Sequence, residues 1–163
     1  MVVAGSQRGG RGRQGRPWHS PPDANLYCSL VLRPARPVRE WADLSWVVAA
    51  AVASAARGAG ADGVALKYPN DVMVGGIGFN ANLSEGDLPE ALRERAVSLL
   101  MLTGRRHDLG ALLARLCGEI DDWYATWVEG GAPAARARLA AAGLPIAGAP
   151  PSTQVAYQSS ISP

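Results

Sequence analysis

The sequence is poor in cysteine and in long hydrophobic runs, and each shortage excludes a class of protein. Its 163 residues contain two cysteines, Cys28 and Cys117, far apart and outside any CxxC motif. This excludes a disulfide framework and a cysteine-based zinc site, and it favours a reducing compartment in which both thiols are buried. The longest apolar run, Trp46 to Ala56, is shorter than the about 20 residues that a bilayer requires. Because the N-terminus also lacks the apolar centre of a secretory signal, we expect a soluble, cytoplasmic protein without a membrane partner.

The composition indicates one folded domain. Hydrophobic residues make up 48% and charged residues 18% of the chain, which suits a packed core and argues against intrinsic disorder. We expect a domain over residues 1–143, followed by a flexible Pro/Ser/Ala-rich tail over residues 144–163. The two histidines, His19 and His107, lack metal-type spacing. We expect both histidines at the surface, and we expect no metal site built from protein side chains.

The hydrophobic pattern predicts an α/β fold. Strand-type composition occurs in three segments, with extended chain resuming at a fourth: residues 2–3, 26–32, 64–67 and 72–74. Helices are predicted over the Ala-rich residues 41–57, from the N-cap Asp108 to Gly130–Gly131, and from about Pro133 to Ala142. The first of these helices is apolar enough to be buried, and Gly58 and Gly60 are expected to end it.

Residues 8–16, RGGRGRQGR, concentrate positive charge in a chain whose formal net charge is only +2. Glycines let backbone N–H groups approach an anion, and the forked guanidinium group of arginine matches phosphate and carboxylate oxygens. The spacing is neither a P-loop nor a dinucleotide-binding fingerprint. A loop over an adenylate or polyphosphate, an Arg/Gly segment that binds nucleic acid through its charge, and a solvated charged loop all remain open at this point.

Lys67 is the only lysine in the chain, and it ends a predicted strand. Pro69 forces the chain out of that strand, and functional side chains often gather where strands of α/β domains end. An amine with a reference pKa of about 10.4 is cationic and suits charge stabilisation. Asn70 and Asp71 could orient this lysine, cap a turn or contact a ligand.

Taken together, these segments resemble the catalytic domain of biotin protein ligases. Residues 7–18, QRGGRGRQGRPW, followed by residues 25–29, NLYCS, resemble the family's adenylate loop, GRGRxGRxW, and its NLYxS strand. Residues 67–72, KYPNDV, resemble its KWPNDV motif, and residues 76–82, GIGFNAN, are similar to its GIGINxN motif. The resemblance covers about residues 2–130, and the first two motifs in combination are specific.

The resemblance implies a fold, a reaction and partners. The fold is a mixed β-sheet packed by helices, as in the class II synthetase-like biotin/lipoate ligase catalytic domain. The reaction is ATP-dependent: the carboxylate of biotin attacks the α-phosphate of ATP, which gives biotinyl-5′-AMP and pyrophosphate. A lysine of a biotin carboxyl carrier domain then attacks the mixed anhydride and releases AMP. ATP and biotin are the substrates, and Mg²⁺ is expected to accompany ATP.

The resemblance also implies site residues. Lys67, Arg11 and Arg13 would neutralise charge as two anions react. The residues expected to bind substrate or nucleotide are Gln7, Gly10, Gly12, Arg16, Trp18, Asn70, Asp71 and Asn80. Trp18 would cover the nucleotide or anchor its loop, and Asn80 would contact the nucleotide or end a strand.

Three departures from the family pattern keep a second hypothesis open. The upstream Ser/Thr-Asn motif is absent, residues 73–75 replace a longer connection with a Gly-Ile-Leu-type strand, and no β domain is recognisable over residues 144–163. The chain is therefore either an active ligase or a ligase-like remnant that binds an adenylate or a partner without transfer. An N-terminal DNA-binding domain is not expected, so neither is DNA binding.

Overall fold

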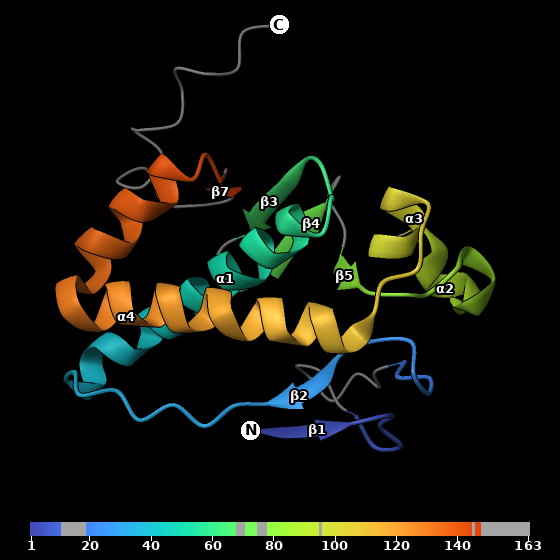
Figure 1. Ribbon diagram of the computed structural model, residues 1–163, viewed down its shortest axis with the longest axis horizontal. Helices are drawn as coiled ribbons and strands as arrows, with labels where there is room; N and C mark the ends of the chain where they lie inside the picture. Colours follow the sequence, from blue (N-terminus) through green and yellow to red (C-terminus); the bar gives the residue numbers. More distant parts are fainter. Residues whose placement is uncertain (11–18, 68–70, 75–77, 95, 145, 148–163) are drawn as a thin grey trace, which may run out of the picture.

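Two packed helices form the framework of the molecule. The computed structural model describes residues 1–10, 19–67, 71–74, 78–94, 96–144 and 146–147. Helix α1 (Leu44–Gly58) follows the 3₁₀ helix η2 (Val38–Asp43) and packs along α4 (Leu109–Ala141), as Figure 1 shows. The helix predicted over residues 41–57 is thus confirmed, although its first residues are 3₁₀-helical.

Helix α4 begins and bends where the sequence indicates. The Asp108 carboxylate accepts a hydrogen bond from the Ala111 backbone N–H at 2.7 Å, which confirms the predicted N-cap. At Gly131 the backbone has φ 65° and ψ −162°, so two helices meet there across a kink. A Cβ at Gly131 would lie 2.7 Å from an Arg36 guanidinium nitrogen, so glycine provides both the left-handed conformation and the room for this arginine.

The described strands pair into three small sheets. β1 (Val2–Ala4) runs antiparallel to β2 (Tyr27–Ser29), and β5 (Gly78–Asn80) runs parallel to β6 (Ala96–Ser98). The third sheet has the order β4-β3-β7, from β4 (Asp71–Val74), β3 (Val64–Lys67) and β7 (Ile146–Ala147). The strand predicted over residues 26–32 is shorter than expected because β1 offers only three pairing residues, and Val31 beyond it is 72% exposed.

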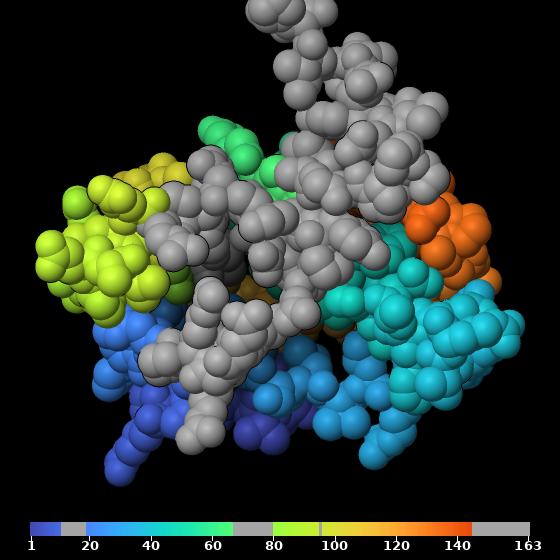
Figure 2. All heavy atoms as spheres, turned by 180° about the vertical axis from the view of Figure 1, so that it is seen from behind, coloured from blue at the N-terminus to red at the C-terminus, as the bar shows by residue number. Residues whose placement is uncertain are grey.

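Short elements occupy one end of the molecule. They are η3 (Glu85–Asp87), α2 (Glu90–Arg93) and α3 (Leu99–Thr103). The Ser98 hydroxyl caps α3 by accepting a hydrogen bond from the Met101 N–H at 3.1 Å. Seen from both sides, α2 and its neighbours lie at the end opposite to η2 and the start of α1 (Figures 1 and 2).

The core lies where α1, α4 and β3 meet. The alanines of α1 are small enough to let α4 approach closely, and the larger side chains of α4 and the strands fill the remaining space. Trp123 and Trp127 are fully buried, and the Trp123 indole N–H donates to the Ser54 hydroxyl at 3.1 Å. Among the helices of the described residues, none is long and apolar enough to cross a membrane. A mixed fold of helices packed on small sheets is therefore confirmed.

The prediction that both histidines lie at the surface is wrong for one of them. His19 is exposed, but His107 is only 9% exposed. The Asn82 side chain bonds both the N–H and the C=O of His107 at 2.8 Å, and the His107 ring lies 2.8 Å from the Thr103 hydroxyl. Asn82 lies far away in the sequence, so the spacing of the histidines could not indicate the burial.

Two other expectations are also corrected. Cys28 and Cys117 are half-buried rather than buried, and the Cys117 sulfur lies 3.7 Å from that of Met1, where the N-terminal strand reaches α4. Residues 144–147 were expected in the flexible tail, but Leu144 is buried, and Ile146 and Ala147 pair with β3. Residues 148–163 lie outside the described residues.

The burial of His107 predicts a pH dependence of stability. Burial, and to a smaller extent the Arg105 guanidinium, lower the pKa of His107 below its ordinary 6.5. Below about pH 6.5 the unfolded chain therefore takes up a proton before the folded chain does, and the folded state loses stability as the pH falls toward the lowered pKa. We expect the free energy of unfolding to fall more steeply below pH 6.5 in the parent protein than in His107→Gln, measured by urea denaturation. Parallel pH profiles would contradict this assignment.

Candidate functional site

The expected site residues divide into three groups. The first group lies outside the described residues and consists of Arg11, Gly12, Arg13, Arg16, Trp18 and Asn70. For Lys67 and Asp71 the structure describes the backbone, and for Gln7, Gly10 and Asn80 it describes the whole residue. The described segments that carry these residues, and the hydrogen bonds that join them, define the candidate site.

The described residues on the two sides of the Arg/Gly segment are hydrogen-bonded to each other. The Asp23 N–H donates to the Gly5 carbonyl at 2.9 Å, and the Ser20 hydroxyl donates to Gln7 Oε1 at 3.3 Å. Tyr27, at the start of β2, donates from its hydroxyl to the Pro21 carbonyl at 2.8 Å. The first two bonds join residues before the Arg/Gly segment to residues after it, and the third holds Pro21 against β2.

The lysine motif lies at the tip of the β3–β4 hairpin. Lys67 is the last residue of β3, as the sequence predicts, and its Cα partner across the antiparallel pair is Asp71 of β4. Directly opposed residues have Cβ atoms about 4.5–5.5 Å apart. On its other side Lys67 pairs with Ala147 of β7. The hairpin therefore holds a cationic and an anionic residue at one end of the sheet.

An asparagine joins the third motif, residues 76–82, to the first, residues 7–18 with residues 25–29. Asn25 accepts a hydrogen bond from the Ala81 N–H at 2.9 Å and donates to Asn80 Oδ1 at 3.4 Å. Asn80 in turn donates to the Val97 carbonyl at 3.2 Å, and the Asn82 N–H donates to the Ala24 carbonyl at 2.8 Å. The Asn80 side chain thus links β5 to β6, which agrees with the interpretation of Asn80 as a strand-end residue. Its expected contact with a nucleotide stays a prediction.

The structure brings the three motifs into one region. Strand β4, which begins with the last two residues of the lysine motif, lies against β5, which is part of the third motif. Asn25 connects β5 to the first motif. The sequence places Asn25 in a motif but does not indicate this role. The one feature that could have indicated this role is the residue type, because asparagine side chains often bond backbone groups nearby.

The described thiols and acids do not point to a different chemistry. Burial raises the pKa of Cys28, and the neighbouring Cys117 adds to this effect. A raised pKa disfavours the thiolate, so Cys28 is not suited to act as a nucleophile at neutral pH. Within the described ranges no group of three or more His, Cys, Asp or Glu residues is arranged to hold a metal ion.

The Asn25 link predicts a measurable loss of stability. In Asn25→Ala the buried Ala81 N–H loses its acceptor, and we expect the free energy of unfolding to fall by about 1–3 kcal/mol. Asn25→Asp keeps an oxygen for the Ala81 N–H and should lose less. Urea denaturation of both variants measures the difference, and equal losses in the two would show that this hydrogen bond does not join the motifs.

Comparison with known proteins gives matches over the same residues. Residues 1–81 match the model of the biotin/lipoate A/B protein ligase family. The bifunctional ligase/repressor BirA of Bacillus spizizenii is 29% identical over 139 residues, which cover 71% of this chain and 43% of that protein. The biotin–[acetyl-CoA-carboxylase] ligase of Paracoccus denitrificans is 44% identical over 78 residues, which cover 46% of this chain and 32% of that protein. The chain thus spans less than half the length of the curated relatives it matches.

A solved structure extends the match beyond residue 81. The biotin protein ligase of Aquifex aeolicus, in complex with biotin and ATP, superposes with a TM-score of 0.71 at 27% identity. The superposition covers 78% of this chain and 61% of that one. An arginine-to-glycine mutant of the same enzyme, in complex with biotin, gives a TM-score of 0.68 at 26% identity, over 79% of this chain and 61% of that one. With the family match over residues 1–81 and the motif segments joined through Asn25, these likenesses support the chain as similar to part of a biotin protein ligase catalytic domain.

Proposed function

We propose that this chain provides the catalytic core of an ATP-dependent biotin ligase. The core would activate biotin as biotinyl-5′-AMP and transfer it to a lysine of a biotin carboxyl carrier domain. The single observation that best supports the proposal is the convergence of three motifs: Asn25 bonds the third motif to the first, and β4 carries the lysine motif to the side of β5. The lysine motif and the third motif are neighbours in the sequence, but Asn25 and Asn80 lie 55 residues apart, and chance similarity would give no reason for these two to meet.

The chemistry of the first step suits the residues of these motifs. A biotin carboxylate must attack the α-phosphate of ATP, so two anions approach each other and positive charge must be placed where negative charge develops. Lys67 at the tip of the hairpin, with Arg11 and Arg13 of the Arg/Gly segment, would provide that charge. Pyrophosphate leaves as the carboxylate oxygen bonds to the phosphorus.

The Arg/Gly segment suits the protection of the product. Its glycines, among them Gly10 and Gly12, allow the backbone N–H groups to approach phosphate oxygens. A loop closed over the mixed anhydride would exclude water from a bond that hydrolyses readily. Mg²⁺ commonly reaches such sites bound to ATP phosphates together with one or two carboxylates, and Asp71 is the carboxylate across the hairpin from Lys67.

Biotin-dependent exchange of labelled pyrophosphate into ATP tests the proposal directly. We expect exchange with biotin and ATP present and none without biotin. Calorimetry with biotinyl-5′-AMP, run on the same folded preparation, separates the outcomes. Adenylate binding without exchange would identify a remnant and refute the enzymatic proposal, and no binding of either kind would refute the assignment of the site. Transfer of biotin to a purified carrier domain then tests the second step.

A further inference from the structure

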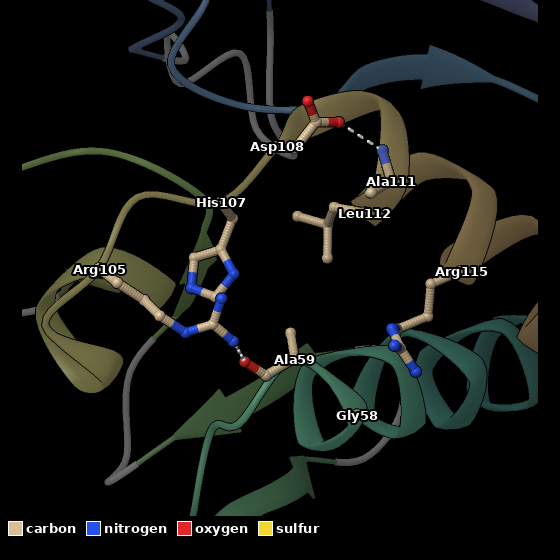
Figure 3. Close-up of a pocket in the computed structure, with 8 residues that line it drawn as sticks. All are labelled: Gly58, Ala59, Arg105, His107, Asp108, Ala111, Leu112 and Arg115. Carbon is tan, nitrogen blue, oxygen red and sulfur yellow. Dashed lines mark hydrogen bonds between the residues drawn. The ribbon is translucent and has the colours of Figure 1, made fainter.

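A pocket of about 210 Å³ has a lining in which, among the described residues, none belongs to the three motifs. It lies where the end of α1, the connection before α4 and the first turns of α4 meet, as Figure 3 shows. Gly58 and Ala59 line it from α1, Leu112 and Arg115 line it from α4, and Arg105 lies on the connection. The volume is below the about 300–1,000 Å³ of pockets for drug-sized ligands, so a small guest is indicated.

Two guanidinium groups face this pocket from different elements (Figure 3). Arg105 is held by a hydrogen bond from Nη2 to the Ala59 carbonyl at 2.9 Å. Arg115 lies over Gly58, so close that a Cβ there would be 2.6 Å from Nη1 of the arginine. The ion pairs found among the described residues include neither arginine.

The Asp108 carboxylate at the pocket is hydrogen-bonded to the start of α4. The Asp108 carboxylate caps α4 through its 2.7 Å hydrogen bond to the Ala111 N–H, and Figure 3 shows it turned toward that group. The buried His107 ring beside Arg105 adds no negative charge. Burial, and to a smaller extent Arg105, lower the pKa of His107 below its ordinary value. The lining therefore carries two arginines and one aspartate, and among the described residues neither arginine forms an ion pair.

We propose that this pocket binds a small dianionic oxyanion of the phosphate class between Arg105 and Arg115. Forked N–H groups from two guanidinium ions match the oxygens of a tetrahedral anion in shape and charge. Gly58 is part of the site because its missing Cβ makes the room that Arg115 occupies. This proposal goes beyond the proposed ligase function, since the described lining contains no residue of the three motifs, although Asn82 of the third motif bonds the backbone of His107 beside the pocket.

The experiment titrates the folded protein with inorganic phosphate at constant ionic strength and follows the His107 ring and backbone amides by NMR. We expect saturable shifts at His107 and at the residues around Gly58. Gly58→Ala should weaken phosphate binding about tenfold or more, because the new methyl group displaces Arg115. Since alanine favours a helix over glycine, this variant should fold at least as stably as the parent.

Matched variants and probes make each outcome decisive. Arg115→Ala should weaken binding like Gly58→Ala, whereas Arg106→Ala, which removes a neighbouring exposed arginine outside the pocket, should leave it unchanged. Sulfate should compete with phosphate, and acetate should bind at least about tenfold more weakly because it carries one charge. Unchanged affinity in Gly58→Ala or Arg115→Ala, equal binding of acetate, or shifts confined to the Arg/Gly segment near Gly10 would overturn the proposal.

Discussion

Replacing Lys67 with alanine is expected to lower biotin-dependent pyrophosphate exchange by about 100-fold or more. The proposed reaction joins a carboxylate to a phosphate, and losing one group that stabilises the developing charge costs about 10²–10³ in rate. Lys67 is the only lysine in the chain, so no neighbouring amine can replace it. Its position at the end of β3, opposite Asp71, is held by pairing with β4 on one side and β7 on the other.

Two further variants separate charge from geometry. Lys67→Arg keeps the positive charge and should retain more exchange than Lys67→Ala, but less than the parent, since a planar fork cannot reproduce the compact ammonium group. Arg106→Ala removes an exposed cation elsewhere and should leave exchange unchanged. If exchange proceeds in Lys67→Ala within about threefold of the parent rate, Lys67 does not stabilise the reacting charges as proposed.

Replacing Trp127 with alanine is expected to lower the free energy of unfolding by about 3–5 kcal/mol, the usual loss for a large aromatic side chain in a core. Trp127 is 0% exposed where α4 meets the rest of the core. The Arg36 guanidinium lies 5.7 Å from its ring centre, and the Tyr124 ring lies 6.1 Å away. A loss of this size is a large part of the about 5–15 kcal/mol that stabilises an ordinary domain.

Control variants identify packing as the cause. The Trp127 indole N–H has no hydrogen-bond partner among the described residues, so Trp127→Phe removes no such bond and should cost much less than Trp127→Ala. Trp41 is 42% exposed, and Trp41→Ala should likewise cost less. Urea denaturation followed by circular dichroism measures all three variants without depending on tryptophan fluorescence. A loss below about 1 kcal/mol in Trp127→Ala would show that the cavity closes by rearrangement.

Features that depend on a few consecutive residues could be predicted from the sequence, and features that join residues far apart in the chain could not. The capping of α4 by Asp108 and the end of β3 at Lys67 were predictable because a cap or a strand end depends on a few consecutive residues. The short elements between residues 85 and 103 were not, since their apolar side chains follow no clear period. Likewise, no local pattern marks Arg105 and Arg115 as two sides of one pocket.

The sequence by itself determined the resemblance to biotin protein ligases and the helical framework of this protein. Its three motifs and the periodicity of its two long helices depend on residues that are close together in the sequence, so residue type and spacing are enough to predict them. Only the tertiary structure decided that Asn25 bonds Ala81, that Asn82 buries His107, and that Ile146 pairs with β3. Each of these contacts joins segments far apart in the chain, and its partner is chosen by how the core packs, which no short stretch of sequence specifies.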